Sequence, residues 1–282
     1  MNTTPDAVLL HRDGRQVGRY VIRPELPARL SPRPYLHPVA TLGGTTVTEL
    51  SPGDHPHHLG VGVAVPDVGG HNFWGGRTFV RDRGPTQLDN HGTQRHTGFR
   101  SADSAGFVEE LRWTAGDREL LRERRTVRAA GLHHTAWALD FTFSLTNVTA
   151  GRLLLSSPAT NGRPGAAYGG FFWRAPKEAE PPRVFTGEAD GEAAVHGTCA
   201  DWVALGGADW TLVFAGATER TRRDPWFVRS AEYPGIGSSL APSEPVPIEA
   251  GESVSRRVVT VVADGRLDRD DAESLIRKAL IP

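Results

Sequence analysis

The sequence predicts an all-β protein: a large two-sheet antiparallel β-sandwich that forms one domain over residues 1–282, with a short C-terminal helix. Along residues 135–147, Trp137, Leu139, Phe141, Phe143 and Leu145 alternate with polar residues, which is typical of a half-buried strand. The 32 glycines and 21 prolines are distributed along the whole chain instead of forming one linker. That distribution favours many short strands joined by turns, and we expect roughly 15–20 strands.

Three hairpins and one late strand follow from turn residues placed between apolar runs. Residues 8–11 and 16–22 flank Asp13-Gly14, a pair that suits a type I′ turn. Residues 36–42 and 45–50 flank one Gly-Gly pair, and residues 202–205 and 210–215 flank another. Residues 257–262 are rich in β-branched side chains and predict a late strand.

Two segments with many charged residues need separate treatment. Residues 120–128 have helix-favouring residues, but their position among strands favours an extended strand with a charged face. Near the end, Asp268 is a suitable N-cap for a helix whose apolar stripe packs on the outside of a sheet. That stripe consists of Ala272, Leu275, Ile276, Ala279 and Leu280.

Composition excludes several classes of protein. A formal net charge of −1 provides no general field that would attract nucleic acid or an anionic membrane, so we expect neither partner. No apolar run reaches about 18 residues, the length that spans a bilayer. The single cysteine, Cys199, excludes a disulfide framework and is expected to be a small buried residue. Together with an N-terminus that lacks a leader pattern, it predicts a cytoplasmic protein.

Two stretches lack any periodicity, residues 51–98 and residues 161–182, and long irregular segments of compact domains are often functional loops. Six of the eleven histidines lie between positions 55 and 96. The densest group is Asp54-His55-Pro56-His57-His58. Imidazole acts as acid, base or metal ligand near neutral pH, so this group is the leading candidate site. In an extended chain His55 and His57 would share one face and His58 the other.

A divalent metal is an open alternative, although no cofactor is predicted. His55 and His57, joined by His91 or His96, would suit zinc, manganese or iron. The cupin pattern fails because the places for its glutamate hold Val61 and Gly62. The chain also lacks the Gly-x-Ser-x-Gly of serine hydrolases, a phosphate-binding Gly-x-x-x-x-Gly-Lys-Ser/Thr and a dinucleotide fingerprint.

Separated motifs resemble a bacterial family often labelled "methane oxygenase PmoA". They are residues 54–60 (DHPHHLG), 70–74 (GHNFW), 96–99 (HTGF), 161–165 (NGRPG), 168–174 (YGGFFWR) and 225–229 (PWFVR). One departure is Leu59, where the family often carries arginine. The label describes a bundle of membrane helices, which this chain does not contain. The resemblance instead implies a galactose-mutarotase-like β-supersandwich that works on carbohydrate.

The leading functional hypothesis is an enzyme that transfers protons on a small-molecule sugar or keto-sugar, as an epimerase, isomerase or lyase. The predicted catalytic residues are His57 or His58, His96, and the carboxylate Glu232 or Asp54. The remaining predicted substrate-binding residues are His55, Asn72, Trp74, Arg77, His91, Asn161, Tyr168, Arg174, Trp226 and Arg229. The alternatives are a metal-dependent oxygenase or hydrolase, and a non-catalytic carbohydrate-binding module.

Overall fold

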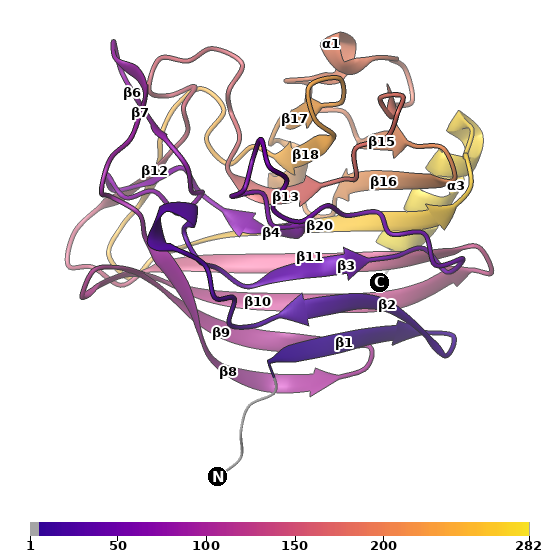
Figure 1. Ribbon diagram of the computed structural model, residues 1–282, viewed down its shortest axis with the longest axis horizontal. Helices are drawn as coiled ribbons and strands as arrows, with labels where there is room; N and C mark the ends of the chain where they lie inside the picture. Colours follow the sequence, from indigo (N-terminus) through magenta and orange to yellow (C-terminus); the bar gives the residue numbers. More distant parts are fainter. Residues whose placement is uncertain (1–5, 282) are drawn as a thin grey trace.

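The computed structural model describes residues 6–281, and antiparallel strands dominate it (Figure 1). The first five residues, on which the expectation of no leader rests, lie outside the described residues. The strands are β1 (Ala7–Arg12), β2 (Arg15–Val21), β3 (Tyr35–Val39), β4 (Val61–Ala64), β5 (Asp67–Val68), β6 (Thr78–Val80), β7 (Gly84–Thr86), β8 (Thr93–Asp103), β9 (Gly106–Ala115), β10 (Arg118–His133), β11 (Ala136–Asn147), β12 (Leu153–Ser156), β13 (Gly170–Arg174), β14 (Arg183–Phe185), β15 (Trp202–Gly206), β16 (Trp210–Gly216), β17 (Trp226–Arg229), β18 (Gly235–Ser238), β19 (Val246–Ile248) and β20 (Ser253–Asp264). The helices are a 3-10 turn (Ala28–Leu30), α1 (Glu192–Val195), α2 (Glu219–Arg222) and α3 (Arg269–Leu280).

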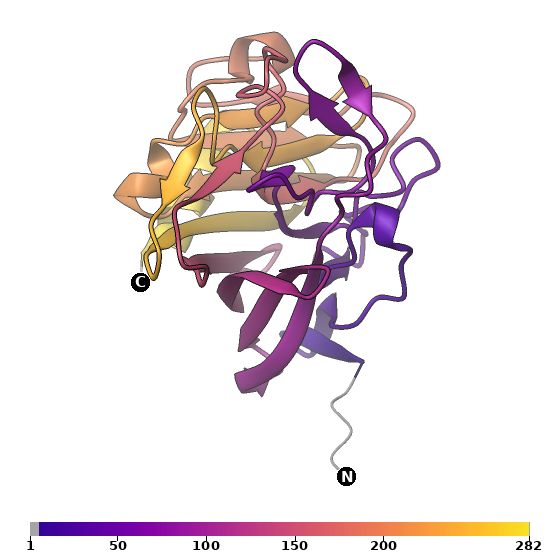
Figure 2. The ribbon, with the colours of Figure 1, turned by 90° about the vertical axis from the view of Figure 1, so that its left-hand side faces the viewer.

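Two large antiparallel sheets pack face to face, so the predicted sandwich is confirmed (Figures 1 and 2). The seven-stranded sheet has the order β1-β2-β3-β4-β13-β18-β17, and the eight-stranded sheet the order β14-β15-β16-β20-β11-β10-β9-β8. Aromatic side chains meet between the sheets: the rings of Trp173 and Phe214 lie 5.5 Å apart, and those of Phe141 and Phe171 5.4 Å apart. Two small sheets, β19-β12-β5 and β6-β7, lie beside this body.

Each strand of the seven-stranded sheet has one face toward the core and one away from it. In β13, Phe171 and Trp173 belong to the main core, whereas Phe172 belongs to a separate apolar cluster on the opposite face. In β17, Val228 faces the core and Phe227 joins that second cluster. The second cluster marks the outer face of the sheet, where loops must cover it.

The first and third predicted hairpins are confirmed as β1–β2 and β15–β16. Asp13 and Gly14 both have positive φ, at 49° and 75°, as a type I′ turn requires. The second expected hairpin was only half right, because residues 45–50 form no regular strand. Their backbone N–H groups donate to two different strands. Val47 N–H donates to the carbonyl of Val39 in β3, and Glu49 N–H donates to the carbonyl of Arg174 in β13.

Residues 120–128 are extended, as favoured, and belong to β10. The late strand is confirmed within β20. Helix α3 is also confirmed: the Asp268 side chain accepts the backbone N–H of Asp271 at 2.8 Å. The expectation of a buried Cys199 was wrong, because this residue is exposed in the loop between α1 and β15. None of the helices between residues 6 and 281 has the length and apolarity needed to cross a membrane.

The charged side chains of residues 120–128 do not all lie on one exposed face of β10, because two of them point into the core. Glu123 and Arg125 are fully buried and form a two-pronged ion pair at 2.7 and 2.9 Å. Trp113 N–H donates to Glu123, and Arg125 also donates to Tyr20 of the opposite sheet at 2.9 Å. This network joins the two sheets through hydrogen bonds in a region shielded from water.

Replacing Glu123 by alanine should therefore destabilise the protein strongly, by about 3–5 kcal/mol, because the Arg125 charge would remain buried without its carboxylate. Glu119→Ala, which removes a partly exposed ion pair with Arg122, should cost about 1 kcal/mol or less. Urea unfolding of both variants measures the difference. Equal losses would show that the buried pair is not a main stabilising contact between the sheets.

Candidate functional site

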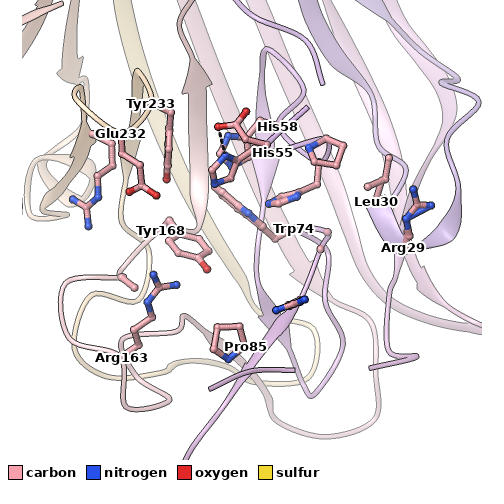
Figure 3. A pocket seen from close by; sticks show the side chains of 18 of the residues that line it. Arg29, Leu30, His55, His58, Trp74, Pro85, Arg163, Tyr168, Glu232 and Tyr233 are labelled. Carbon is pink, nitrogen blue, oxygen red and sulfur yellow. Dashed lines mark hydrogen bonds and ion pairs between the residues drawn. The ribbon is translucent and has the colours of Figure 1, made fainter. Parts of the chain in front are cut away.

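A cavity of about 410 Å³ lies over the outer face of the seven-stranded sheet (Figure 3). Its walls come from loops far apart in the sequence, including both irregular regions and the turn between β17 and β18. The lining residues are Arg29, Leu30, Asp54, His55, Pro56, His57, His58, Trp74, Gly75, Gly76, Arg77, Pro85, Gln87, Arg163, Ala166, Tyr168, Phe227, Arg229, Glu232 and Tyr233. Its volume is in the range of small-molecule sites.

Aromatic side chains pack into one layer at this end of the sheet. The ring of Trp74 lies 4.9 Å from that of Phe172, which β13 directs outward, and 4.6 Å from that of Tyr168. The ring of Phe227, outward on β17, lies 5.5 Å from that of Tyr168. Because these contacts hold the aromatic rings, the cavity has a rigid apolar side.

The side chains of His55, His57 and His58 converge, but their backbone does not have the extended conformation that we expected. Turn hydrogen bonds connect His55 N–H to Pro52 and His58 N–H to His55, which folds the segment back. As a result the rings of His55 and His58 stack at 4.6 Å, and that of His57 lies 4.8 Å from His58. The expectation of His58 on the face opposite His55 was wrong for this reason.

His55 is the histidine paired with a carboxylate that also lines the cavity. Its Nδ1 lies 3.0 Å from Asp54 Oδ2, and both side chains are partly exposed to the cavity. The hydrogen bond from His55 lowers the pKa of Asp54. An imidazole oriented in this way by a carboxylate keeps its other nitrogen, Nε2, available to a ligand.

His58 forms the buried floor. Only 2% of it is exposed, and burial, followed by the nearby His57 and His55, holds its pKa well below the usual range. The guanidinium of Arg174 approaches His58 Nδ1 at 3.5 Å and is itself held by Glu49 at 2.8 Å. Since arginine can only donate, Nδ1 is the acceptor, and the neutral ring carries its proton on Nε2.

His57 is packed against glycines and also held neutral. A Cβ at Gly76, whose φ is +70°, would stand 2.9 Å from the His57 ring, and one at Gly75 would stand 2.7 Å from its Cβ. Desolvation first, then the charge of Arg33, lowers the pKa of His57 to about 3. The Gly75-Gly76 turn therefore provides the close approach that fits His57 into the wall.

Tyr233 is a site residue that the sequence reasoning missed. Its ring lies 4.7 Å from that of His55 and 5.1 Å from that of His58 (Figure 3). The Arg174 guanidinium lies 5.0 Å from the centre of the Tyr233 ring. Burial raises the pKa of Tyr233 above the usual value, so the phenol stays protonated. Its neighbour Glu232, predicted as a catalytic carboxylate, is exposed at the cavity rim.

Many predicted residues line the cavity: Asp54, His55, His57, His58, Trp74, Arg77, Tyr168, Arg229 and Glu232. Besides Tyr233, the sequence reasoning missed Arg29, Gln87, Arg163 and Phe227. A weak signal existed for two of these, since Arg163 lies in the motif of residues 161–165 and Phe227 in that of residues 225–229. Arg29 carried no signal, because its segment is an ordinary Pro-rich stretch.

Other predicted residues support the cavity from outside it. Asn72 Oδ1 accepts the N–H groups of Trp74 and Gly75, both at 2.8 Å, which shapes the turn behind His57. His91 Nε2 lies 2.7 Å from the Gly76 carbonyl. Arg174, as described, lies behind His58. Direct ligand contact was the expectation for these residues, and the structure places them in the layer behind.

Three predicted residues lie elsewhere. His96 is on β8, with its side chain 2% exposed and its Nδ1 2.6 Å from the buried carboxylate of Glu109. It borders a different cavity, near Arg95, so the structure does not bring it to His57. Trp226 is core and donates to the Ala200 carbonyl at 2.9 Å, while Asn161 contacts Asp67 at 3.2 Å.

The proposed metal ligands do not assemble. Across residues 6–281, no three side chains of His, Cys, Asp or Glu are arranged to hold a metal ion. Neither His91 nor His96 lines the cavity that holds His55 and His57, and His96 borders a different one.

Residues 7–277 match the sequence model of a family of unknown function (DUF6807). The chain belongs to this family. Its description names no activity, so the resemblance to proteins labelled methane oxygenase, like the resemblance to mutarotases, stays a prediction. No curated protein sequence matches the chain.

A solved structure of a polysaccharide lyase is similar at 12% sequence identity, with a TM-score of 0.41. The similarity covers 98% of this chain but only 35% of the lyase, so the chain spans about a third of that protein. A likeness this weak carries no argument about activity.

The low pKa of His57 makes stability depend on pH. Below about pH 6.5 the unfolded chain binds a proton at His57 that the folded chain, with its pKa of about 3, does not bind. The unfolding free energy should therefore fall with decreasing pH, by up to about 1.4 kcal/mol per pH unit from this group.

Urea unfolding of wild type and His57→Gln between pH 8 and pH 5 measures this contribution. The variant should show a shallower decline below pH 6.5, whereas above pH 7.5 the difference between the two proteins should be constant. Parallel curves over the whole range would contradict a buried neutral His57.

Proposed function

We propose that this protein is an enzyme that transfers protons on a sugar or sugar derivative bound in the cavity. One observation carries the proposal: the Asp54–His55 pair opens on the cavity with the Tyr233 ring 4.7 Å from the imidazole. The ring of a proton acceptor and the ring of a proton donor thus lie in contact at the cavity.

His55 is the proton acceptor. Its Nδ1–H is directed to Asp54, so Nε2 holds the lone pair, and the carboxylate stabilises the imidazolium that forms when a proton arrives. This assignment replaces the predicted His57 or His58. Burial keeps both of those rings neutral, and a base with a pKa of about 3, like His57, is too weak to take a proton from a sugar.

Tyr233 is the proton donor. Its raised pKa keeps the O–H bond intact at neutral pH, which makes it available to an oxygen that gains negative charge. At an anomeric centre, His55 would take the hydroxyl proton while Tyr233 protonates the ring oxygen, and the ring C–O bond would break to give the open-chain aldehyde. At a carbon beside a carbonyl, the same pair would remove a C–H proton and protonate the oxygen of the resulting enolate.

The sugar is inferred from the mixed lining of the cavity. Tyr168, which is backed by the buried ring of Trp74 at 4.6 Å, offers aromatic surface to the apolar face of a pyranose ring. The Gln87 amide is a planar polar group that suits hydroxyls. A non-catalytic carbohydrate-binding module would share this lining, but it would have no use for the His55–Tyr233 pair.

The test is proton exchange on a panel of aldoses, ketoses and sugar acids in D₂O, followed by NMR as anomer interconversion and as deuterium uptake at carbon. His55→Ala should lower the rate by about 10²–10⁴-fold, the usual contribution of a general base. Tyr233→Phe should cause a comparable loss. His134→Ala, which changes an exposed histidine outside the cavity, is the matched control and should keep the wild-type rate.

If His55→Ala and Tyr233→Phe both retain the wild-type rate, the assignment of the pair is wrong. Wild-type protein that binds sugars from the panel but exchanges no proton with any of them would support the binding module instead.

A further inference from the structure

Arginine is the main charged residue around the cavity. Four arginines line it, Arg29, Arg77, Arg163 and Arg229, against two carboxylates, Asp54 and Glu232. With the neutral His57 and His58, the lining has a net positive charge of two, although the whole chain has a formal net charge of −1. Positive charge is therefore concentrated at this cavity, although the molecule as a whole has a slightly negative net charge.

The positive charge is not cancelled by neighbouring side chains. Arg229 has one distant partner, Glu192 at 3.6 Å. Within residues 6–281, Arg29, Arg77 and Arg163 form no ion pair within 4 Å, and all three are exposed to solvent. Of the two lining carboxylates, Asp54 already accepts a hydrogen bond from His55. Figure 3 shows Arg29 on one side of the cavity and Arg163 beside Tyr168 on another.

A fifth arginine adds positive charge beneath the wall. Arg33 is 4% exposed, and its guanidinium donates to the carbonyls of Leu30, Ser31, Trp74 and His57 at 2.7–3.2 Å. No carboxylate of the described chain lies within 4 Å of it, so backbone dipoles alone solvate this charge. In a poorly polarisable interior its field extends into the cavity, since the guanidinium lies 2.7 Å from the carbonyl oxygen of His57, a lining residue.

We infer that the cavity takes an anionic carbohydrate, a sugar that carries a carboxylate or phosphate group. The inference rests on the proposed sugar site and narrows its substrate class. Guanidinium groups bind both anions through paired N–H donors, and arginines without ion-pair partners can do so without breaking an ion pair. A carboxylate held by arginine beside the reacting carbon would also make its C–H proton more acidic, which suits removal by His55.

Isothermal titration with matched sugars tests the inference. The probes are D-glucuronate and D-galacturonate for the carboxylate, glucose 6-phosphate for the phosphate, and D-glucose and D-galactose as neutral partners. At least one acidic sugar should bind about 10-fold or more tightly than its neutral partner, and its affinity should fall as salt rises from 50 to 500 mM. Tight binding of a uronate would identify the recognised group as a carboxylate, and tight binding of glucose 6-phosphate would identify it as a phosphate. The His55→Ala variant, titrated in parallel, allows binding to be measured without turnover.

Variants of the cavity arginines show which of these residues bind the anionic group. Arg77→Gln and Arg163→Gln should each weaken binding of the acidic sugar about 10-fold and leave binding of the neutral sugar nearly unchanged. Arg118→Gln is the matched control, since this exposed arginine of β10 lies outside the cavity, and it should keep the wild-type affinity.

Equal affinity for acidic and neutral sugars, or equal losses in Arg77→Gln and Arg118→Gln, would overturn the anionic substrate while leaving the sugar enzyme standing. Acidic sugars that bind as expected but exchange no proton would overturn the proposed enzyme and keep the anion site. If no sugar of either kind binds, both proposals fail.

Discussion

The alternation of side chains across the seven-stranded sheet is the constraint on which the rest of the structure depends. Because successive residues of a strand point to opposite faces, β13 must send Phe172 outward wherever it buries Phe171 and Trp173 against the second sheet. The same rule directs Phe227 of β17 outward. One packing event, the burial of one face, thereby creates an apolar floor on the other face, and the loops that cover this floor form the cavity.

Burial also decides how protons are distributed in the site. Removing His57 and His58 from water disfavours their charged forms, while the same loss of water keeps the Tyr233 phenol protonated. The His55 side chain is 25% exposed, and its Nδ1 contacts Asp54. The three histidines therefore have different surroundings: His57 is packed into the wall, His58 forms the floor, and His55 opens on the cavity.

The interior charges are arranged so that each is stabilised without water. Arg125 has the full carboxylate partner Glu123, Arg174 has Glu49, and Arg33 has only backbone carbonyls. The first two pairs are neutral in sum and serve to join elements of the fold. Arg33 is not neutralised, and it lies directly behind the histidine loop, so the fold itself gives the cavity a positive background that the rim arginines extend.

The sequence by itself determined the fold class, the hairpin at Asp13-Gly14 and the capped helix after Asp268, and it indicated the loop from Asp54 to His58 as the candidate site. These features depend on local chemistry: strand period, positive φ at a turn, a cap, and a local excess of imidazole. Only the tertiary structure decided which residues meet. His96 has the same side chain as His55 but pairs with Glu109 of the neighbouring strand β9, outside the cavity, whereas Tyr233 and Arg29, which have no motif of their own, line the cavity. The physical reason is that convergence depends on strand order and loop paths between segments about 200 residues apart, and spacing along the chain does not contain that information.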